Sequence, residues 1–157
     1  MNNKGFTLLE LMIVIAIFGI FLVVAAPKMG GSKTDFKLYT IARNLVSDIR
    51  YAQELSINTR DKHGIFFSQS SYEIKNTITA KTVKTIEFNS GVSYEKIVDS
   101  SDNPVGDGVV FDSTGKPFED DGASAFVNLS TIYLKASDVY IYIKITPETG
   151  EVSFERN

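Results

Sequence analysis

The chain has 157 residues, of which 43% are hydrophobic and 22% are charged, and its formal net charge is −3. These totals are typical of one globular domain and exclude a disordered chain, a collagen-like chain and a membrane protein with several spans. The slightly negative charge argues against a protein built mainly to grip phosphate backbones. The lack of cysteine excludes disulfide bonds, thiol catalysis and cysteine-based zinc sites.

A long apolar run extends from Phe6 to Ala26 and contains one charged residue, Glu10. As a helix it would measure about 31 Å, enough to cross the hydrocarbon core of a bilayer. It is apolar on every side, unlike an amphipathic surface helix, and a domain this small rarely buries such a helix completely. A removable secretory signal is disfavoured because the run is long, carries a carboxylate near its start and is followed by Pro27. We therefore predict a transmembrane helix over residues 6–27.

Glu10 is the unusual residue of this run. An ionised side chain in hydrocarbon costs at least about 2.5–3.5 kcal/mol, so such a group normally has a partner. The run contains no Lys or Arg, and a partner must therefore come from elsewhere. Alternatively, Glu10 lies only one turn into the run and could reach the nearer interface. The residues alone leave both interpretations open.

Residues 4–10, KGFTLLE, with the apolar run that follows, resemble the class III leader of type IV pilins and type II secretion pseudopilins. The shared features are a short basic leader, a Gly before the cleavage site, a Phe after it and a Glu five residues into the mature chain. The resemblance implies that a prepilin peptidase/N-methyltransferase removes the leader 1–5 after Gly5 and methylates Phe6. It also implies that Glu10 pairs with the Phe6 amine of a neighbouring subunit, where a low dielectric strengthens the attraction.

Gly19 and Pro27 are the helix-weakening residues of the apolar segment. Proline lacks a backbone donor and clashes one turn back, so a kink is expected at Pro27. Ser32 with Asp35 has the pattern of a capping box, which predicts a new helix start. We expect either a kinked continuous helix or a short hinge near residues 27–32. The resemblance to pilins also implies that the stretch from Gly19 to Pro27 can unwind when subunits pack.

Residues 28–60 are predicted to form an amphipathic stem helix, most regular over 34–58. Its apolar side chains recur at helical spacing and would pack on a globular head: Leu38, Ile41, Ala42, Leu45, Val46, Ile49 and Ala52. The stem segment carries a charge of +3, whereas the chain from residue 61 onward carries −6. This contrast could help the head of one subunit pack against the stem of another, although solvated surfaces are the simpler interpretation.

From residue 61 the pattern changes to short alternating runs, after a polar loop that ends at Gly64. The strands are predicted over 65–67, 72–74, 82–88, 92–98, 109–111, 125–134, 139–145 and 152–154, and the first two form a hairpin. Strand 139–145 alternates clearly, with Val139, Ile141, Ile143 and Ile145 on one face. We predict an α+β fold, in which a long N-terminal helix packs on an antiparallel β-rich head over 61–157.

Three further segments carry a second resemblance. Residues 42–60, 111–117 (FDSTGKP) and 141–152 (IYIKITPETGEV) are similar to the GspH/FimT group of minor pilins and pseudopilins in their apolar and glycine positions. This resemblance implies that the head belongs to a minor or initiating subunit.

No pattern of an enzyme is present: the sequence lacks a nucleophile elbow, a P-loop and an HExxH motif. His63, the single histidine, lies in the polar loop, and we expect it to be a solvated surface residue. The tyrosines at 133, 140 and 142 could form a binding patch, but packing within a sheet is the preferred interpretation. We expect no catalytic site and no cofactor.

Oxygen-rich loops raise the question of a calcium site. The acidic side chains that could contribute are Asp99, Asp102, Asp107, Asp112, Glu119, Asp120 and Asp121. Their spacing does not match an EF-hand loop, so we expect solvated acidic loops and no metal site.

The sequence therefore predicts a structural minor pilin or pseudopilin subunit. It would be a single-pass protein of the inner (cytoplasmic) membrane with its head outside the cytoplasm, then part of a type IV pilus or type II secretion pseudopilus, at the tip or in the shaft. Its partners would be the peptidase, other pilin subunits and the assembly platform. Two alternatives are a DNA-uptake (competence) pilin, which the acidic head disfavours, and an uncleaved single-span protein with an extracytoplasmic binding domain.

Overall fold

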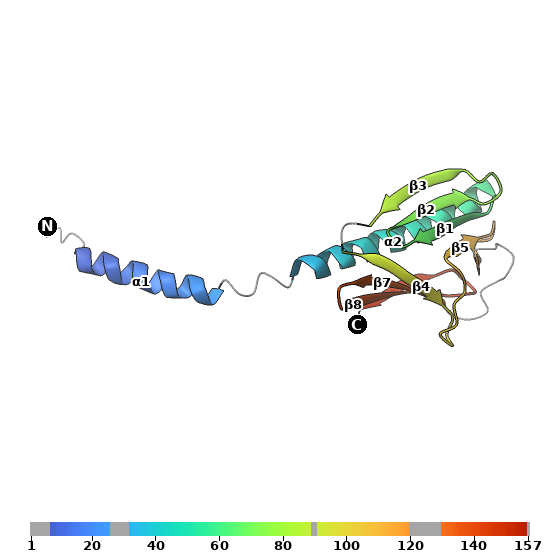
Figure 1. Ribbon diagram of the computed structural model, residues 1–157. Coiled ribbons are helices and arrows are strands. Elements are labelled where there is room, and N and C mark those ends of the chain that lie inside the picture. Colours follow the sequence, from blue (N-terminus) through green and yellow to red (C-terminus); the bar gives the residue numbers. More distant parts are fainter. Residues whose placement is uncertain (1–6, 26–31, 89–90, 120–129, 157) are drawn as a thin grey trace. The chain divides into compact units, whose positions relative to one another are not determined.

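The computed structural model describes residues 7–25, 32–88, 91–119 and 130–156, with all side chains of these ranges except those of 22–25, 32–35 and 156. The chain forms two compact units, Met1–Lys33 and Thr34–Asn157. Figure 1 shows a single helix in the first unit, and a helix with β-sheets in the second. Every buried hydrophobic side chain of the described residues belongs to the second unit, which therefore has a core of its own. The predicted α+β fold with antiparallel sheets is confirmed.

Helix α1 extends over Leu8–Ala25. Its residues are mostly apolar, and the helix continues through Gly19 without interruption. Among the described residues, none of the helices combines the length and the apolar character needed to cross a membrane.

Helix α2 extends over Ser32–Thr59. The face predicted to pack on the head is buried: Leu38, Ala42, Leu45, Ile49 and Ala52 have no exposed surface. These positions recur every three or four residues and so fall on one side of the helix. The helix ends just before Arg60, whose φ of 59° is left-handed.

The first sheet has five antiparallel strands in the order β3-β2-β1-β5-β6. Their bounds are His63–Ser68 for β1, Ser71–Asn76 for β2, Thr82–Glu87 for β3, Gly108–Phe111 for β5 and Pro117–Glu119 for β6. Strands β1 and β2 form the predicted hairpin, in which Ser68 lies opposite Ser71. Strand β6 was not predicted, because three residues are too few to show an alternating pattern.

The second sheet has four antiparallel strands in the order β4-β7-β8-β9. Their bounds are Ser93–Val98 for β4, Ser130–Ala136 for β7, Val139–Ile145 for β8 and Val152–Arg156 for β9. Strand β7 continues two residues beyond its predicted end at Leu134, while the first predicted residues, 125–129, lie outside the described ranges. On β8, the side chains of Ile141, Ile143 and Ile145 are buried on the face that the alternation predicted.

One core cluster joins α2 to both sheets. It contains the buried face of α2, Ile65 and Ile74 from the first sheet, and Leu134 and Ile143 from the second. In Figure 1, α2 runs alongside the strands of both sheets. Burial of each Leu or Ile side chain contributes about 1.5–3 kcal/mol to the stability of this arrangement. The helix therefore covers the apolar strand faces, as the sequence predicted.

Gln53 on α2 holds two turns of the head. Its Nε2 donates hydrogen bonds to the carbonyl oxygens of Gly115 and Thr149, each at 2.9 Å. Gly115 and Gly150 have φ values of 83° and 67°, which favour glycine. A Cβ on Gly150 would lie 2.5 Å from Gln53 Nε2 and 2.9 Å from the Gly115 carbonyl oxygen. The glycines of the DSTG and PETG turns are therefore required by backbone conformation and by close packing on Gln53.

Gly64 lies inside β1, and the prediction that it ends a loop is wrong. A Cβ at this position would lie 2.8 Å from the carbonyl oxygen of Val109 and 2.9 Å from Cγ2 of Val110. Real Cβ atoms do not approach other atoms this closely, so β1 and β5 can pair here only because residue 64 has no side chain.

Candidate assembly site

The predicted processing residues Gly5 and Phe6 lie outside the described residues, which begin at Thr7. Thr7 caps α1: its Oγ1 accepts a hydrogen bond from the backbone N–H of Glu10 at 3.2 Å, and its carbonyl oxygen accepts from Glu10 and Leu11 at 3.1 and 3.3 Å. Glu10 is the third helical residue, so Thr7 and Glu10 have the spacing of a capping box. A carboxylate in the first turn also interacts favourably with the helix dipole. Glu10 therefore occupies a position that suits the start of a helix, independently of any partner subunit.

The capping box predicted at Ser32 and Asp35 falls on side chains outside the described set. The backbone of α2 does begin at Ser32. The pattern Thr7-x-x-Glu10 is the same signal, and it could have been recognised from the sequence.

The surface of α1 is apolar and exposed. Every large hydrophobic side chain described on this helix is exposed, from 41% for Val14 to 79% for Leu8. Contiguous exposed apolar surfaces of this kind occur where a protein contacts lipid or other protein surfaces. The helix is therefore a candidate surface for both kinds of contact.

The two residues predicted to weaken the N-terminal helix differ in what the structure describes. Gly19 lies within α1, and a Cβ at this position would have no neighbour within 4 Å. No contact among the described residues of this chain therefore requires glycine there. Pro27 lies outside the described residues, as do the other residues from 26 to 31, and so does most of the predicted hinge.

A buried carboxylate joins α2 to the first sheet. Asp48 accepts a hydrogen bond from Tyr72 Oη at 2.8 Å and two from Lys84 Nζ at 2.7 and 2.8 Å. Burial, together with the hydrogen bond to Asp48 and its charge, raises the pKa of Tyr72 far above the ordinary value. This cluster was not recognised from the sequence, because its members are 12 to 36 positions apart and share no local pattern.

His63 is not a solvated loop residue, and that prediction is wrong. It is the first residue of β1, and only 4% of its surface is exposed. Its backbone N–H donates to Ser56 Oγ at 3.0 Å, and its Nδ1 lies 3.2 Å from the carbonyl oxygen of Asp61. Nε2 lies 3.4 Å from Nδ2 of Asn76. Because only residues 60–62 separate α2 from β1, the chain reaches the sheet before Gly64 and buries this side chain, which holds the start of the strand.

Two of the acidic residues considered for calcium binding stabilise their own turns. Asp99 Oδ1 accepts from the backbone N–H of Ser101 and Asn103 at 2.8 and 2.9 Å. The bonds from Asn103 and Ser101 lower the pKa of Asp99. For Asp112, burial acts to raise the pKa. Hydrogen bonds from Thr114 and Lys116, together with the charge of Lys116, outweigh this effect and lower the pKa of Asp112.

Asp102 lies in the same turn as Asp99, because its backbone N–H donates to the carbonyl oxygen of Asp99 at 3.1 Å. Asp102 pairs with Lys96 at 2.9 Å, and Asp107 accepts a hydrogen bond from Tyr94 Oη at 2.7 Å. Asp120 and Asp121 lie outside the described residues. In the part of the chain that the structure describes, no three His, Asp or Glu side chains are grouped so that they could hold a metal ion.

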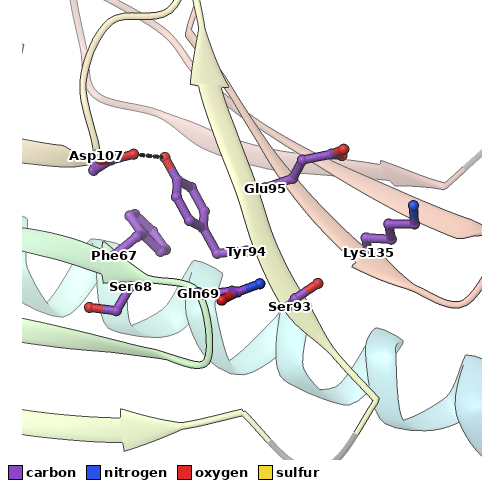
Figure 2. A pocket seen from close by; sticks show the side chains of 8 residues that line it. All are labelled: Phe67, Ser68, Gln69, Ser93, Tyr94, Glu95, Asp107 and Lys135. Atoms are coloured by element: carbon purple, nitrogen blue, oxygen red, sulfur yellow. Dashed lines mark hydrogen bonds between the residues drawn. The ribbon is translucent and has the colours of Figure 1, made fainter.

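A polar groove of about 460 Å³ lies where the β1–β2 hairpin meets β4. Figure 2 shows the ring of Tyr94 beside Phe67 and its hydroxyl directed at Asp107. The two rings stack with their centroids 4.8 Å apart, and both are buried. The accessible walls of the groove, among them Ser68, Gln69 and Glu95, are therefore polar. This composition does not suit an apolar ligand, because the aromatic surface is already used in packing.

The three tyrosines considered as a binding patch, at 133, 140 and 142, pack against their neighbours in the second sheet. Tyr133 and Tyr142 meet edge to face across β7 and β8, with ring centroids 4.9 Å apart. Lys96 Nζ lies 5.1 Å from the centre of the Tyr133 ring, and Lys135 Nζ lies 5.2 Å from that of Tyr140. These are cross-strand contacts of the kind that stabilise a sheet.

Comparison with known proteins adds two findings. The family model of the prokaryotic N-terminal methylation motif matches residues 1–26. No curated protein matches the sequence. The motif covers the segment that contains Gly5, Phe6 and Glu10.

Several solved structures share the fold. One is the type IV minor pilin FimU of Pseudomonas aeruginosa PAO1, with a TM-score of 0.57 and 13% identity over 77% of this chain and 90% of that chain. A second crystal form of FimU gives 0.55 and 12% identity, over 74% and 91% of the two chains. Another is the minor pseudopilin EpsH of the type 2 secretion system of Vibrio cholerae, with 0.55 and 10% identity over 76% and 97%. At these identities the similarity concerns the fold.

The fold is thus that of minor pilins and pseudopilins. An N-terminal methylation motif and this fold occur together in one chain, and they support the type IV pilin/pseudopilin family that the sequence resemblance predicted. The chain thus combines the fold of minor pilins and pseudopilins with an N-terminal methylation motif.

Proposed function

We propose that the chain is a minor pilin or pseudopilin subunit, cleaved after Gly5, anchored in the cytoplasmic membrane through residues 6–27 and then incorporated into a type IV pilus or type II secretion pseudopilus. The observation that carries this proposal is the methylation motif over residues 1–26, which includes a helix with exposed apolar side chains. The head, with the minor-pilin fold, would lie outside the cytoplasm. The proposed role is structural and requires no catalysis.

The apolar segment supports this role through its chemistry. The 21 residues from Phe6 to Ala26 are enough to cross a bilayer as a helix. Before assembly, lipid would cover the apolar side chains, and afterwards the same helices of other subunits would do so. Lipid tails are as apolar as Leu, so this exchange alone gives little driving force. Packing and polar contacts must therefore decide whether a subunit enters the filament.

Glu10 is the charged group of the segment, and it can supply such a contact. In a neighbouring subunit, the amine of Phe6 created by cleavage would be its partner, and the low dielectric would strengthen their attraction. Removing one partner would leave the other buried and uncompensated, which costs about 3–5 kcal/mol. Cleavage by the prepilin peptidase/N-methyltransferase and delivery to the assembly platform would precede this step.

The test compares Glu10→Ala with Glu54→Ala, which removes an exposed carboxylate from α2. Both variants are produced in cells that make the filament, and the amounts of chain in membranes and in sheared filaments are measured. We expect Glu10→Ala to reach the membrane normally but to be reduced more than about tenfold in filaments, since 1.4 kcal/mol already corresponds to a factor of ten. Glu54→Ala should be incorporated normally. Normal incorporation of Glu10→Ala would show that the proposed pairing is wrong.

A further inference from the structure

A groove of about 550 Å³ runs between α2 and β9, and we name it the α2–β9 groove. Its walls are Arg43, Val46, Ser47 and Arg50 on the helix, and residues 151–154 on the strand side. In the described part of the chain, β9 is the last strand in the order of the second sheet, and only its edge toward β8 is paired with another strand. The unpaired edge of a strand carries backbone groups that can accept a further strand.

The direction of these backbone groups follows from the pairing of β9 with β8. The N–H of Thr146 donates to the carbonyl oxygen of Glu151 at 2.9 Å, so the backbone of Glu151 faces β8. The direction of the backbone N–H and C=O groups alternates along an antiparallel strand, so these groups of Val152 and Phe154 point away from β8. Arg50 confirms this direction, because its Nη2 donates to the carbonyl oxygen of Val152 at 2.9 Å.

The outward groups of Phe154 have no such partner. Among the residues that the structure describes, no hydrogen bond reaches the N–H or the C=O of Phe154 on this side. One donor and one acceptor are therefore available side by side, and Arg50 already occupies the next outward carbonyl group along the strand. An incoming strand would bond to the half of β9 around Phe154.

The side chains of the groove favour an acidic partner. Arg43 is exposed, and its guanidinium lies 5.9 Å from the centre of the Tyr39 ring. The Tyr39 ring in turn meets Phe154 edge to face at 5.4 Å. Across the described ranges, no carboxylate pairs with Arg43. Among the described residues that line the groove, Arg43 and Arg50 outnumber the single acidic residue, Glu151, although the chain as a whole is negative.

We propose that the α2–β9 groove binds an extended acidic segment of a partner protein, which adds to β9 as a further strand. The peptide backbone would supply an acceptor for the N–H of Phe154 and a donor for its C=O. A carboxylate of the segment would meet Arg43, and the rings of Tyr39 and Phe154 offer surface for an apolar side chain. A nucleic acid fits less well, because a phosphodiester backbone has acceptors but no donor for the carbonyl group. This inference concerns the head alone and does not depend on cleavage or filament entry.

The test measures peptide binding to the purified full chain in detergent micelles by fluorescence anisotropy. The probe is a labelled short peptide of alternating Glu and Val residues, and a second peptide carries N-methyl groups on alternate residues, which removes the donors of one edge. The unmethylated peptide should bind, and the methylated one should bind at least about tenfold more weakly. A single-stranded oligothymidylate serves as the nucleic-acid probe and should bind more weakly than the acidic peptide.

Two charge-reversed variants locate the binding site. Arg43→Glu should lower the affinity for the acidic peptide at least about tenfold, because it removes a charge-assisted hydrogen bond. Lys81→Glu changes the charge equally at an exposed residue that is not part of the groove, and it should bind as the unmodified chain does.

Four results would overturn the proposal. They are no peptide binding at concentrations up to about 1 mM, equal binding of the two peptides, equal loss of affinity in the two variants, and tighter binding of the oligothymidylate that depends on Arg43. The comparison of the two peptides uses the unmodified chain, so it remains decisive if a variant does not fold.

Discussion

Replacing Asp48 by Ala tests how the stem helix is held to the first sheet. The side chain of Asp48 is 11% exposed, whereas that of Lys84 is 48% exposed. Solvent therefore screens their ion pair, which we expect to contribute at most about 1 kcal/mol. The hydroxyl of Tyr72 is in a different position, because this side chain is buried and would lose its acceptor. An unsatisfied buried hydroxyl costs about 1–3 kcal/mol.

The two contributions together predict that Asp48→Ala lowers the free energy of unfolding by about 1–4 kcal/mol. Lys84→Ala should lower it by less than about 1 kcal/mol. The assay is urea-induced unfolding of residues 34–157, the unit that contains the described core, followed by circular dichroism. Asp138→Ala, which removes an exposed carboxylate from the turn between β7 and β8, is the control and should change the free energy by less than about 0.5 kcal/mol. Equal losses for Asp48→Ala and Lys84→Ala would refute the reasoning, because the ion pair would then dominate.

Three further predictions concern single residues. Gly64→Ala should lower the free energy of unfolding by at least about 2 kcal/mol in the same assay, because its Cβ would lie 2.8 Å from the Val109 carbonyl oxygen; a loss below about 0.5 kcal/mol would show that the strands can separate. Folding raises the pKa of Tyr72 above its ordinary value of 10.0, so the unfolded chain loses this proton first and the free energy of unfolding falls as the pH rises above 10.0. In Tyr72→Phe the free energy of unfolding should fall less steeply with pH, and identical slopes in the two proteins would contradict the assignment. Thr7→Ala should destabilise the first turn of α1 by about 1 kcal/mol and therefore speed amide hydrogen exchange of Glu10 in micelles. Thr7→Ser keeps the hydroxyl and should not change this exchange rate. Equal exchange rates in the two variants would rule out the cap.

The elements that were predicted from the sequence are those with a local pattern. The buried face of α2 repeats every three or four residues, and β8 alternates over seven residues, so both are readable within one segment. The leader motif is also local, and the family model matches the same residues. Strand β6 is too short to carry such a pattern.

What was missed depends on contacts between distant segments. The burial of His63 follows from where α2 ends, and that end is set by a left-handed Arg60, a residue type that gives no warning of it. Gln53 accounts for the glycines of the two turns, but its partners are 62 and 96 positions away. The division of the strands into two sheets likewise depends on which edges pair, which alternation does not specify.

The central proposal is that this chain is processed at its N-terminus as a pilin subunit, and the sequence of the mature N-terminus tests it most directly. The chain is isolated from the membranes of cells that carry a prepilin peptidase, and its N-terminal peptide is sequenced by mass spectrometry. We predict an N-terminus at Phe6 that carries a methyl group on its amine. A chain that begins at Met1, or at Pro27 after cleavage as an ordinary secretory signal, would contradict the proposed function.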